Sequence, residues 1–159
     1  VMDAEGALPL LTVFGGKLTT YRELANHVAE KLKPYFPEMR APWTHAEPLP
    51  GGDTPSVTAL FTGLQARYSG LPKDYVYALL RRYGTRVTRI LDKADTIEEL
   101  GIRFSPTLTQ REVDYLMNEE WAQTADDVLW RRTKAGLGMT SAERQAVATY
   151  IFSMTPGRM

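Results

Sequence analysis

Apolar residues change their spacing at Gly15, and this change predicts two successive elements near the N-terminus. Four of the five residues in 10–14 are apolar, a short run typical of a buried strand. Gly15 and Gly16 follow and permit backbone angles that other residues avoid. Beyond them, apolar side chains recur on one helix face, at Leu18, Tyr21, Leu24, Ala25, Val28 and Leu32. The pattern therefore predicts a strand, a glycine turn and a helix over 17–33 that Pro34 ends.

The rest of the chain has a helical pattern almost throughout. Thr54 is expected to cap a helix that ends at Gly70, a second helix begins near Pro72 and stops at Gly84, and Thr85 starts a shorter third. The apolar stripes of these three helices are expected to form a core.

Three further helices are predicted to begin at capping sequences. Thr109–Glu112 and Thr140–Glu143 each combine a hydroxyl with a carboxylate, so that both can satisfy orphan backbone donors. Thr124 is placed to cap the helix between them, which Gly136 closes, and Pro156 ends the last helix.

Residues 34–53 predict a connector between two parts of the chain. Five prolines and the Gly51-Gly52 pair lie in this stretch, and such a composition interrupts regular structure. Besides 10–14, only 101–104 is expected to be extended. The fold class is therefore mainly α, a compact multi-helix C-terminal domain preceded by a strand–Gly-Gly–helix segment.

Charge and composition exclude several classes of function. Nineteen basic side chains balance nineteen acidic ones, so no broad positive field attracts nucleic acid. The absence of cysteine excludes disulfides, thiolate metal sites and a cysteine nucleophile. His27 and His45, the only histidines, have no partner at metal-ligand spacing, so no metal is expected.

The hydropathy pattern predicts a cytoplasmic protein. No apolar run approaches the roughly 20 residues that span a bilayer, and no signal peptide is visible. Any membrane contact is expected to be peripheral.

The glycine turn is the main candidate for a binding site. A strand, a glycine pair and a free helix N-terminus together suit an anion or the electron-rich edge of a cofactor, and Lys17 adds a positive charge. By itself, a Gly-Gly turn before a helix is most often only a tight turn. Neither a phosphate loop nor a dinucleotide fingerprint occurs in the chain.

Four separated motifs carry a resemblance to a known family. VFGGKLTTYRELA at 13–25 resembles the segment that closes the flavin domain of FAD-dependent, quinone-linked glycerol-3-phosphate dehydrogenases. Residues 120–134, EWAQTADDVLWRRTK, are similar to that family's C-terminal helical domain. LPGGD at 49–53 and LRRYG at 80–84 also fit, so the resemblance covers nearly the whole chain.

The resemblance implies a domain organisation and a reaction. Residues 1–40 would be the end of an α/β FAD-binding domain, 41–53 a linker, and 54–159 the C-terminal helical domain. The family oxidises sn-glycerol 3-phosphate to dihydroxyacetone phosphate by hydride transfer to FAD and passes the electrons to quinone. A contact with the inner face of the cell membrane and a homo-oligomer both stay open.

The resemblance also assigns roles to the residues of the glycine turn. Gly16, Lys17, Leu18 and Thr19 would bind the cofactor, and Lys17 would in addition bind the substrate phosphate. No catalytic residue is assigned within this chain. FAD is expected in the full-length enzyme and not in this fragment, which by itself should be inactive because the adenine-nucleotide-binding half is missing.

Several alternatives stay open at this point. Lys17 can be a solvated lysine, and Arg22 can either reach the glycine turn or form a surface ion pair. Arg81, Arg82, Arg86 and Arg89 are expected to pack their stems and pair with acids, and Arg131-Arg132 to hold the domain's internal geometry. The whole chain can instead be an independent helical module that binds a protein or a membrane. Against this, the chain opens in mid-pattern and its strand at 10–14 has no expected partner.

Overall fold

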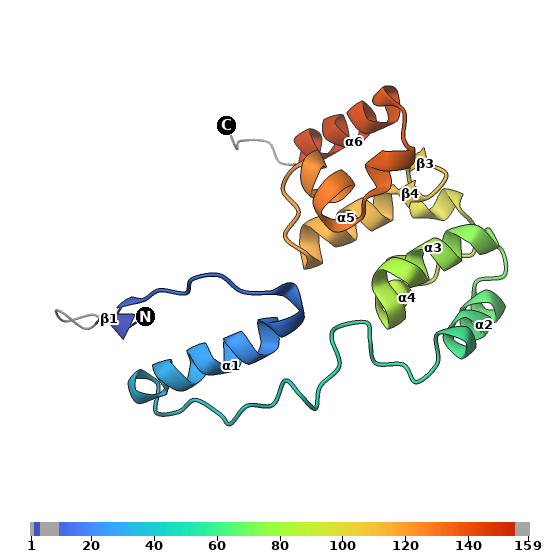
Figure 1. Cartoon of the computed structure of the whole chain (residues 1–159). Helices are drawn as coiled ribbons and strands as arrows, with labels where there is room; N and C mark the ends of the chain where they lie inside the picture. Colours follow the sequence, from blue (N-terminus) through green and yellow to red (C-terminus); the bar gives the residue numbers. More distant parts are fainter. Residues whose placement is uncertain (1, 4–9, 155–159) are drawn as a thin grey trace. The chain divides into compact units, whose positions relative to one another are not determined.

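The computed structural model describes residues 2–3 and 10–154 and divides into two compact units. Unit 1 comprises Val1–Pro48 and unit 2 comprises Leu49–Met159. Figure 1 labels their helices and strands. The expected helix end at Pro156 lies outside the described residues. The predicted domain boundaries at 40 and 53 stay a prediction.

Unit 1 contains a short strand pair followed by a helix. β1 (Met2–Asp3) pairs antiparallel with β2 (Leu10–Leu11), so that Met2 faces Leu11. The prediction of an unpaired strand over 10–14 was wrong, because a partner lies only a few residues upstream and the pairing stops at Leu11. The predicted helix is present as a short 3₁₀ turn η1 (Leu18–Thr20), the helix α1 (Tyr21–Leu32) and a second 3₁₀ turn η2 (Lys33–Tyr35).

Unit 1 has no buried core of its own among its described residues. No residue from 10 to 48 is buried. The apolar stripe of α1 is only half-buried at Leu24, Val28 and Leu32. The helix therefore shows an apolar face that unit 1 does not fully cover.

Unit 2 is mainly helical, which confirms the predicted fold class. Its elements in chain order are α2 (Val57–Arg67), α3 (Lys73–Tyr83), η3 (Gly84–Arg86), α4 (Val87–Leu91), η4 (Glu98–Leu100), β3 (Arg103–Ser105), β4 (Leu108–Thr109), α5 (Gln110–Glu119), the π-helix η5 (Asp127–Arg132), η6 (Ala135–Gly138) and α6 (Ser141–Met154). β3 and β4 form an antiparallel hairpin close to the extended segment expected at 101–104.

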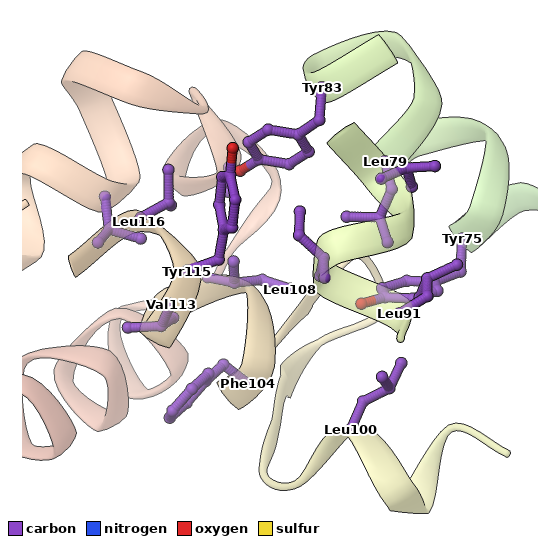
Figure 2. Packing of buried hydrophobic residues seen from close by; sticks show 14 of the residues in the cluster. Tyr75, Leu79, Tyr83, Leu91, Leu100, Phe104, Leu108, Val113, Tyr115 and Leu116 are labelled. Atoms are coloured by element: carbon purple, nitrogen blue, oxygen red, sulfur yellow. The ribbon is translucent and has the colours of Figure 1, made fainter. Parts of the chain in front are cut away.

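The core of unit 2 lies between α3, α4, the hairpin and α5. Figure 2 shows aliphatic and aromatic side chains from these elements packed together. Seven of them have no exposed surface, namely Leu79, Val87, Ile90, Leu91, Leu108, Val113 and Leu116. The rings of Tyr83 and Tyr115 meet edge to face with centroids 5.4 Å apart, a favoured aromatic arrangement. Burial of this apolar surface is the main term that stabilises unit 2.

Two of the predicted helix starts are confirmed. The Thr140 hydroxyl accepts from the Glu143 amide, and the Glu143 carboxylate accepts from the Thr140 amide at 2.6 Å. Thr124 makes the same exchange with Asp127. The helix that follows Thr124 is wound as a π-helix, a form that the capping sequence does not specify.

One predicted capping residue was wrong, and one predicted capping box is absent. Ser56, not Thr54, caps α2, since its hydroxyl accepts from the Ala59 amide. At α5 the predicted start is confirmed, since the helix begins at Gln110 directly after Thr109, but Thr109 makes no side-chain capping bond. The Thr109 hydroxyl is hydrogen-bonded to the Tyr75 hydroxyl at 3.0 Å instead, and Glu112 turns into the core. The local sequence satisfied the capping pattern, but buried partners elsewhere in the fold compete for the carboxylate.

Candidate functional site

The glycine turn of unit 1 has the backbone geometry that its sequence predicts. Gly15 has φ +74° and Gly16 has φ +130°, both in the region that residues with side chains rarely adopt. A Cβ atom built on Gly16 would lie 3.1 Å from a side-chain carbon of Leu24. Glycine is therefore required at this position, by its backbone angle and by its neighbour.

The four predicted site residues lie together on the surface of unit 1. Gly16, Lys17, Leu18 and Thr19 are all exposed, with Leu18 at 90% of its full surface. The Lys17 carbonyl accepts from the Thr20 amide at 3.0 Å and from the Thr20 hydroxyl at 3.3 Å, which closes the first turn. No carboxylate among the described residues pairs with the Lys17 ammonium group. The turn thus presents accessible backbone and one cation.

This arrangement leaves the backbone open to a planar ring and places a positive charge beside it. Two residues without side chains let a planar ring approach the main chain, and an unpaired cation at the same place suits negative charge. Unit 1 provides no buried wall around this edge among its described residues. Any remaining contacts must come from another part of a protein.

Arg22 does not join the glycine turn. Its guanidinium donates to the Thr44 carbonyl at 3.1 Å, which ties α1 to the segment that returns along it. Neither the contact with the turn nor the ion pair considered for Arg22 is present among the described residues. Arg22 therefore organises unit 1 and leaves Lys17 as the cation of the turn.

A groove of about 330 Å³ separates the extended segment 11–14 from α1. Phe14 and Val13 line one side, and Leu24, Val28 and the exposed His27 line the other. The groove is mainly apolar, and it continues from the glycine turn along the helix. His27 therefore lies at a surface of unit 1 that another element can cover.

Unit 2 contains a buried polar cluster that the sequence did not reveal. Glu112 has no exposed surface, and its Oε1 accepts from the Arg82 guanidinium at 2.7 Å and from the Tyr83 hydroxyl at 2.8 Å. Arg82 also donates to the Thr107 carbonyl at 3.0 Å. Glu112 thereby fastens α3 to α5, and Arg82 fastens both to the hairpin turn.

Burial controls the ionisation of this cluster. Removal from water raises the pKa of Glu112, while Arg82 and the Tyr83 hydroxyl act in the opposite direction. Burial, and next the charge of Glu112, raise the pKa of Tyr83. Among the buried side-chain nitrogen and oxygen atoms of the described residues, only Oε2 of Glu112 has no hydrogen-bond partner. Because no part of Glu112 is exposed, the cluster serves the packing of unit 2 and does not meet a substrate.

One signal for Glu112 was present in the sequence. Position 112 lies one helical turn before the buried Leu116 and next to the buried Val113, so it belongs to the inward face of α5. A carboxylate on that face needs a buried donor. The donors come from α3, about 30 residues earlier, and the sequence does not show that they converge.

The arginines around Gly84 follow the predicted pattern in part: Arg82 pairs with an acid, and no ion pair of Arg81 is present among the described residues. Arg89 pairs with Glu119 at 3.3 Å, and Arg86 donates to the Tyr115 hydroxyl at 3.4 Å.

Arg131 and Arg132 both pair with Asp127, at 3.0 and 3.3 Å. The Gln123 amide, then the Thr124 hydroxyl and amide and the Arg131 guanidinium, hold the pKa of Asp127 well below its usual range. These side chains connect elements of unit 2.

The described residues contain neither a membrane-spanning helix nor a cluster of metal ligands. None of their helices is long and apolar enough to cross a bilayer. No group of three or more His, Asp or Glu side chains in the same residues could hold a metal ion.

Comparisons with known proteins place the chain in a family. The family model for the C-terminal domain of alpha-glycerophosphate oxidase matches residues 42–156. A glycerol-3-phosphate dehydrogenase from Pseudomonas aeruginosa is 45% identical over 96% of this chain. A D-erythritol 1-phosphate dehydrogenase from Brucella abortus is 43% identical over 91% of this chain. An aerobic glycerol-3-phosphate dehydrogenase from Escherichia coli is 38% identical over the whole of this chain.

The chain spans 29–32% of the length of these relatives. The matches confirm the resemblance to glycerol-3-phosphate dehydrogenases that the sequence motifs indicated. The family model covers most of the chain and all the helices of unit 2. The chain therefore belongs to the family defined by the C-terminal domain of alpha-glycerophosphate oxidase.

Proposed function

We propose that this chain is the C-terminal portion of an FAD-dependent dehydrogenase that oxidises sn-glycerol 3-phosphate to dihydroxyacetone phosphate. The observation that carries the proposal is the similarity of 45% over 96% of the chain to a protein named for this activity, because it extends through unit 1 as well as unit 2. The relatives are about three times as long, which leaves room for the dinucleotide-binding part that this chain lacks.

Unit 1 supplies one edge of the cofactor site in this proposal. Gly15 and Gly16 let the ring approach the main chain, and the backbone amides of Leu18 and Thr19 would donate to its polar edge. FAD, when bound, supplies the acceptor for the hydride from the carbinol carbon of the substrate. The exposed glycine turn and the incompletely covered face of α1 support this assignment.

Lys17 binds the substrate phosphate and holds positive charge at the reacting end of the site. A fixed cation in a site closed to water stabilises negative charge more strongly than it would in solvent. Lys17 is exposed in unit 1, and none of its described neighbours neutralises it. It does not move a proton in this proposal. The proton acceptor for the carbinol hydroxyl lies in the part of the enzyme outside this chain.

A second substrate deserves a direct comparison. The relative named D-erythritol 1-phosphate dehydrogenase is 43% identical to this chain, close to the value for the glycerol-3-phosphate dehydrogenase. The substrates in the two names are both polyol monophosphates, so Lys17 serves either one. Glycerol 3-phosphate is the first choice, since most of the relatives carry its name. Assays with both compounds decide between them.

A chimaeric enzyme tests the proposal. This chain replaces the matching C-terminal part of the Pseudomonas aeruginosa relative, and glycerol-3-phosphate oxidation is followed with a quinone analogue as acceptor. Lys17→Ala should lower kcat/KM by about tenfold or more, which corresponds to about 1.4 kcal/mol of transition-state stabilisation. Lys17→Arg should recover part of the loss, and Lys33→Ala, an exposed lysine of η2 in the same unit, is the control.

The outcomes separate the parts of the proposal. An active chimaera that is insensitive to Lys17→Ala would remove Lys17 from the site but keep the assignment of the chain. A chimaera that folds, binds FAD and oxidises neither polyol phosphate would contradict the assignment itself.

The proposal also includes the electron acceptor, a quinone, and the place where the enzyme meets it. A quinone acceptor is dissolved in lipid, so the enzyme works as a peripheral protein at the inner face of the cell membrane. Sedimentation of the chimaera with quinone-containing vesicles tests this step. Activity with a water-soluble acceptor but none with vesicles would contradict it.

The competing proposal is an independent helical module that binds a protein or a membrane. It differs in what the isolated chain should do. Under our proposal the 159-residue chain binds FAD weakly, because the dinucleotide-binding fold supplies most of the affinity. Stoichiometric binding at micromolar FAD, followed by flavin fluorescence, would overturn this division of roles.

A further inference from the structure

Two of the sequence motifs, LPGGD and LRRYG, meet in the structure of unit 2. Gly51 has φ +89° and Gly84 has φ +56°. A Cβ atom on Gly84 would overlap the Gly51 carbonyl oxygen, and a Cβ atom on Gly51 would overlap the Tyr83 carbonyl oxygen. Both positions therefore require glycine for two reasons, the left-handed backbone and the close approach of another main chain.

Hydrogen bonds hold the two motifs together at this contact. The Thr85 amide donates to the Gly51 carbonyl at 3.0 Å, and the Thr85 hydroxyl donates to the Asp53 carboxylate. The Gly52 amide donates to the Leu49 carbonyl at 2.7 Å, which closes a turn within the first motif. Residues 49–53 thus lie fixed against the C-terminal end of α3 before α2 begins at Val57.

The end of α3 is itself held from inside the core. Arg82 and Tyr83, the two residues before Gly84, both donate to the buried Glu112 of α5. The same stretch of backbone therefore meets residues 49–53 on its outer side and the buried carboxylate on its inner side. A segment attached here is attached to the most buried part of unit 2.

We propose that residues 49–53 are a strap that fixes the point at which the polypeptide coming from unit 1 joins the helical unit. With the strap closed, the connecting segment ends at Pro48, and the chain is held against unit 2 from Leu49 onward. If it opened, residues 49–56 would become free, and eight extended residues reach about 26–29 Å. The glycine pair therefore limits how far the two units can move apart, and it does so whatever reaction the protein performs.

Amide hydrogen exchange on the full chain tests the strap directly. Gly84→Ala should raise the exchange rate of the Thr85 amide at least tenfold, while amides in α5 keep their protection. Gly70→Ala is the matched control, because its Cβ would overlap the Asp95 carbonyl elsewhere in unit 2. Gly63→Ala is the neutral control, since nothing lies near its Cβ.

A second variant keeps the test decisive if Gly84→Ala fails to fold. Asp53→Ala removes only the exposed bond to the Thr85 hydroxyl, and it should raise Thr85 exchange severalfold without loss of the core. Unchanged Thr85 protection in both variants would overturn the strap. An equal rise in Gly70→Ala would also overturn it, because the effect would then be general destabilisation.

The distance between spin labels on the two units tests whether the strap limits their separation. The chain contains no cysteine, so Glu23→Cys in α1 and Gln145→Cys in α6 provide two unique positions for spin labels. Gly84→Ala should broaden the distribution of distances between the labels, and Gly70→Ala should not. Equal widths in the two variants, with the strap open by hydrogen exchange, would refute its role in limiting motion.

Discussion

The helices α1 and α3 are almost equal in length and similarly amphipathic, yet they differ completely in burial. α3 has 11 residues and buries five of its side chains. α1 has 12 residues and buries none. The difference lies in what surrounds each helix, since α3 packs against α2 and α4 within unit 2, whereas the main contacts of α1 are with the flanking 3₁₀ turns η1 and η2. An apolar stripe therefore shows which face of a helix must be covered and does not show what covers it.

The same contrast separates the candidate site from the core. The glycine turn of unit 1 is accessible and has an unneutralised cation, whereas the polar groups of unit 2 are buried or paired with one another. Accessible charged groups without a partner favour ligand binding, whereas buried polar groups that pair with one another favour a structural role. This difference supports the proposal that the ligand contacts lie in unit 1 and that unit 2 is structural support.

The largest expected effect is the loss of the buried carboxylate in unit 2. Glu112→Ala leaves the Arg82 guanidinium without its partner and should lower the free energy of unfolding by about 3–5 kcal/mol. Glu30→Ala, an exposed position on α1, should change it by less than about 0.5 kcal/mol. Urea denaturation followed by tryptophan fluorescence measures both. A small effect of Glu112→Ala would mean that the cluster is dispensable.

Truncation of one leucine in each helix compares the two units directly. Leu79→Ala in α3 removes a fully buried side chain and should cost about 2–5 kcal/mol. Leu24→Ala in α1 truncates a half-buried side chain and should cost less than about 1 kcal/mol. Equal losses in thermal or urea denaturation would contradict the absence of a core in unit 1.

The pH dependence of stability should carry the signature of Glu112. Burial raises its pKa above the usual 4.5, so the folded state holds the proton more tightly than the unfolded state. Its contribution to stability is therefore greatest below that pH and falls as the pH rises through the folded pKa. The stability of the wild type relative to Glu112→Gln should decrease from about pH 4 to pH 7, by about 1.4 kcal/mol per unit of pKa difference.

Asp127 provides the opposite sign within the same unit. Its pKa is lowered from 3.8, so its contribution is present above that pH and is lost as the pH falls. Asp127→Asn should therefore destabilise at neutral pH, and the loss should become smaller as the pH falls below 3.8. A difference between wild type and either variant that does not change with pH would contradict the assigned direction.

The smallest predicted effect concerns the two helix starts. Ser56 caps α2 through its hydroxyl, so Ser56→Ala should cost about 1 kcal/mol. Thr20 precedes α1 without a side-chain capping bond, so Thr20→Ala should be nearly neutral. Thermal denaturation of the two variants, followed by circular dichroism, compares them. A cost at Thr20 equal to that at Ser56 would show that α1 depends on its start more than its contacts indicate.

The sequence predicted most of the fold because helix starts, helix ends and apolar stripes are local. Gly84 ends α3, and Thr140 begins the last helix as expected. The sequence could not place Glu112, since its partners on α3 are distant along the chain. For the same reason it did not reveal that Gly51 and Gly84 meet.

The candidate site was predictable in part. The backbone angles of Gly15 and Gly16 follow from the glycine pair, and the exposed position of Lys17 follows from its place before the helix. The role of Lys17 stays a prediction, because a ligand contact depends on groups that lie outside this chain. The partner of Arg22 could not be predicted, because Thr44 lies in an irregular segment without a periodic sequence pattern.

Amide hydrogen exchange along the whole chain tests the central contrast most directly. The amides of α3 and α5 should exchange only through unfolding of unit 2 and should be slow by several orders of magnitude, because their helices are buried. The amides of α1 should exchange rapidly in the isolated chain and become protected in the chimaeric enzyme, where the rest of the protein covers the helix. Protection of α1 equal to that of α3 in the isolated chain would show that unit 1 is complete by itself and would contradict the account.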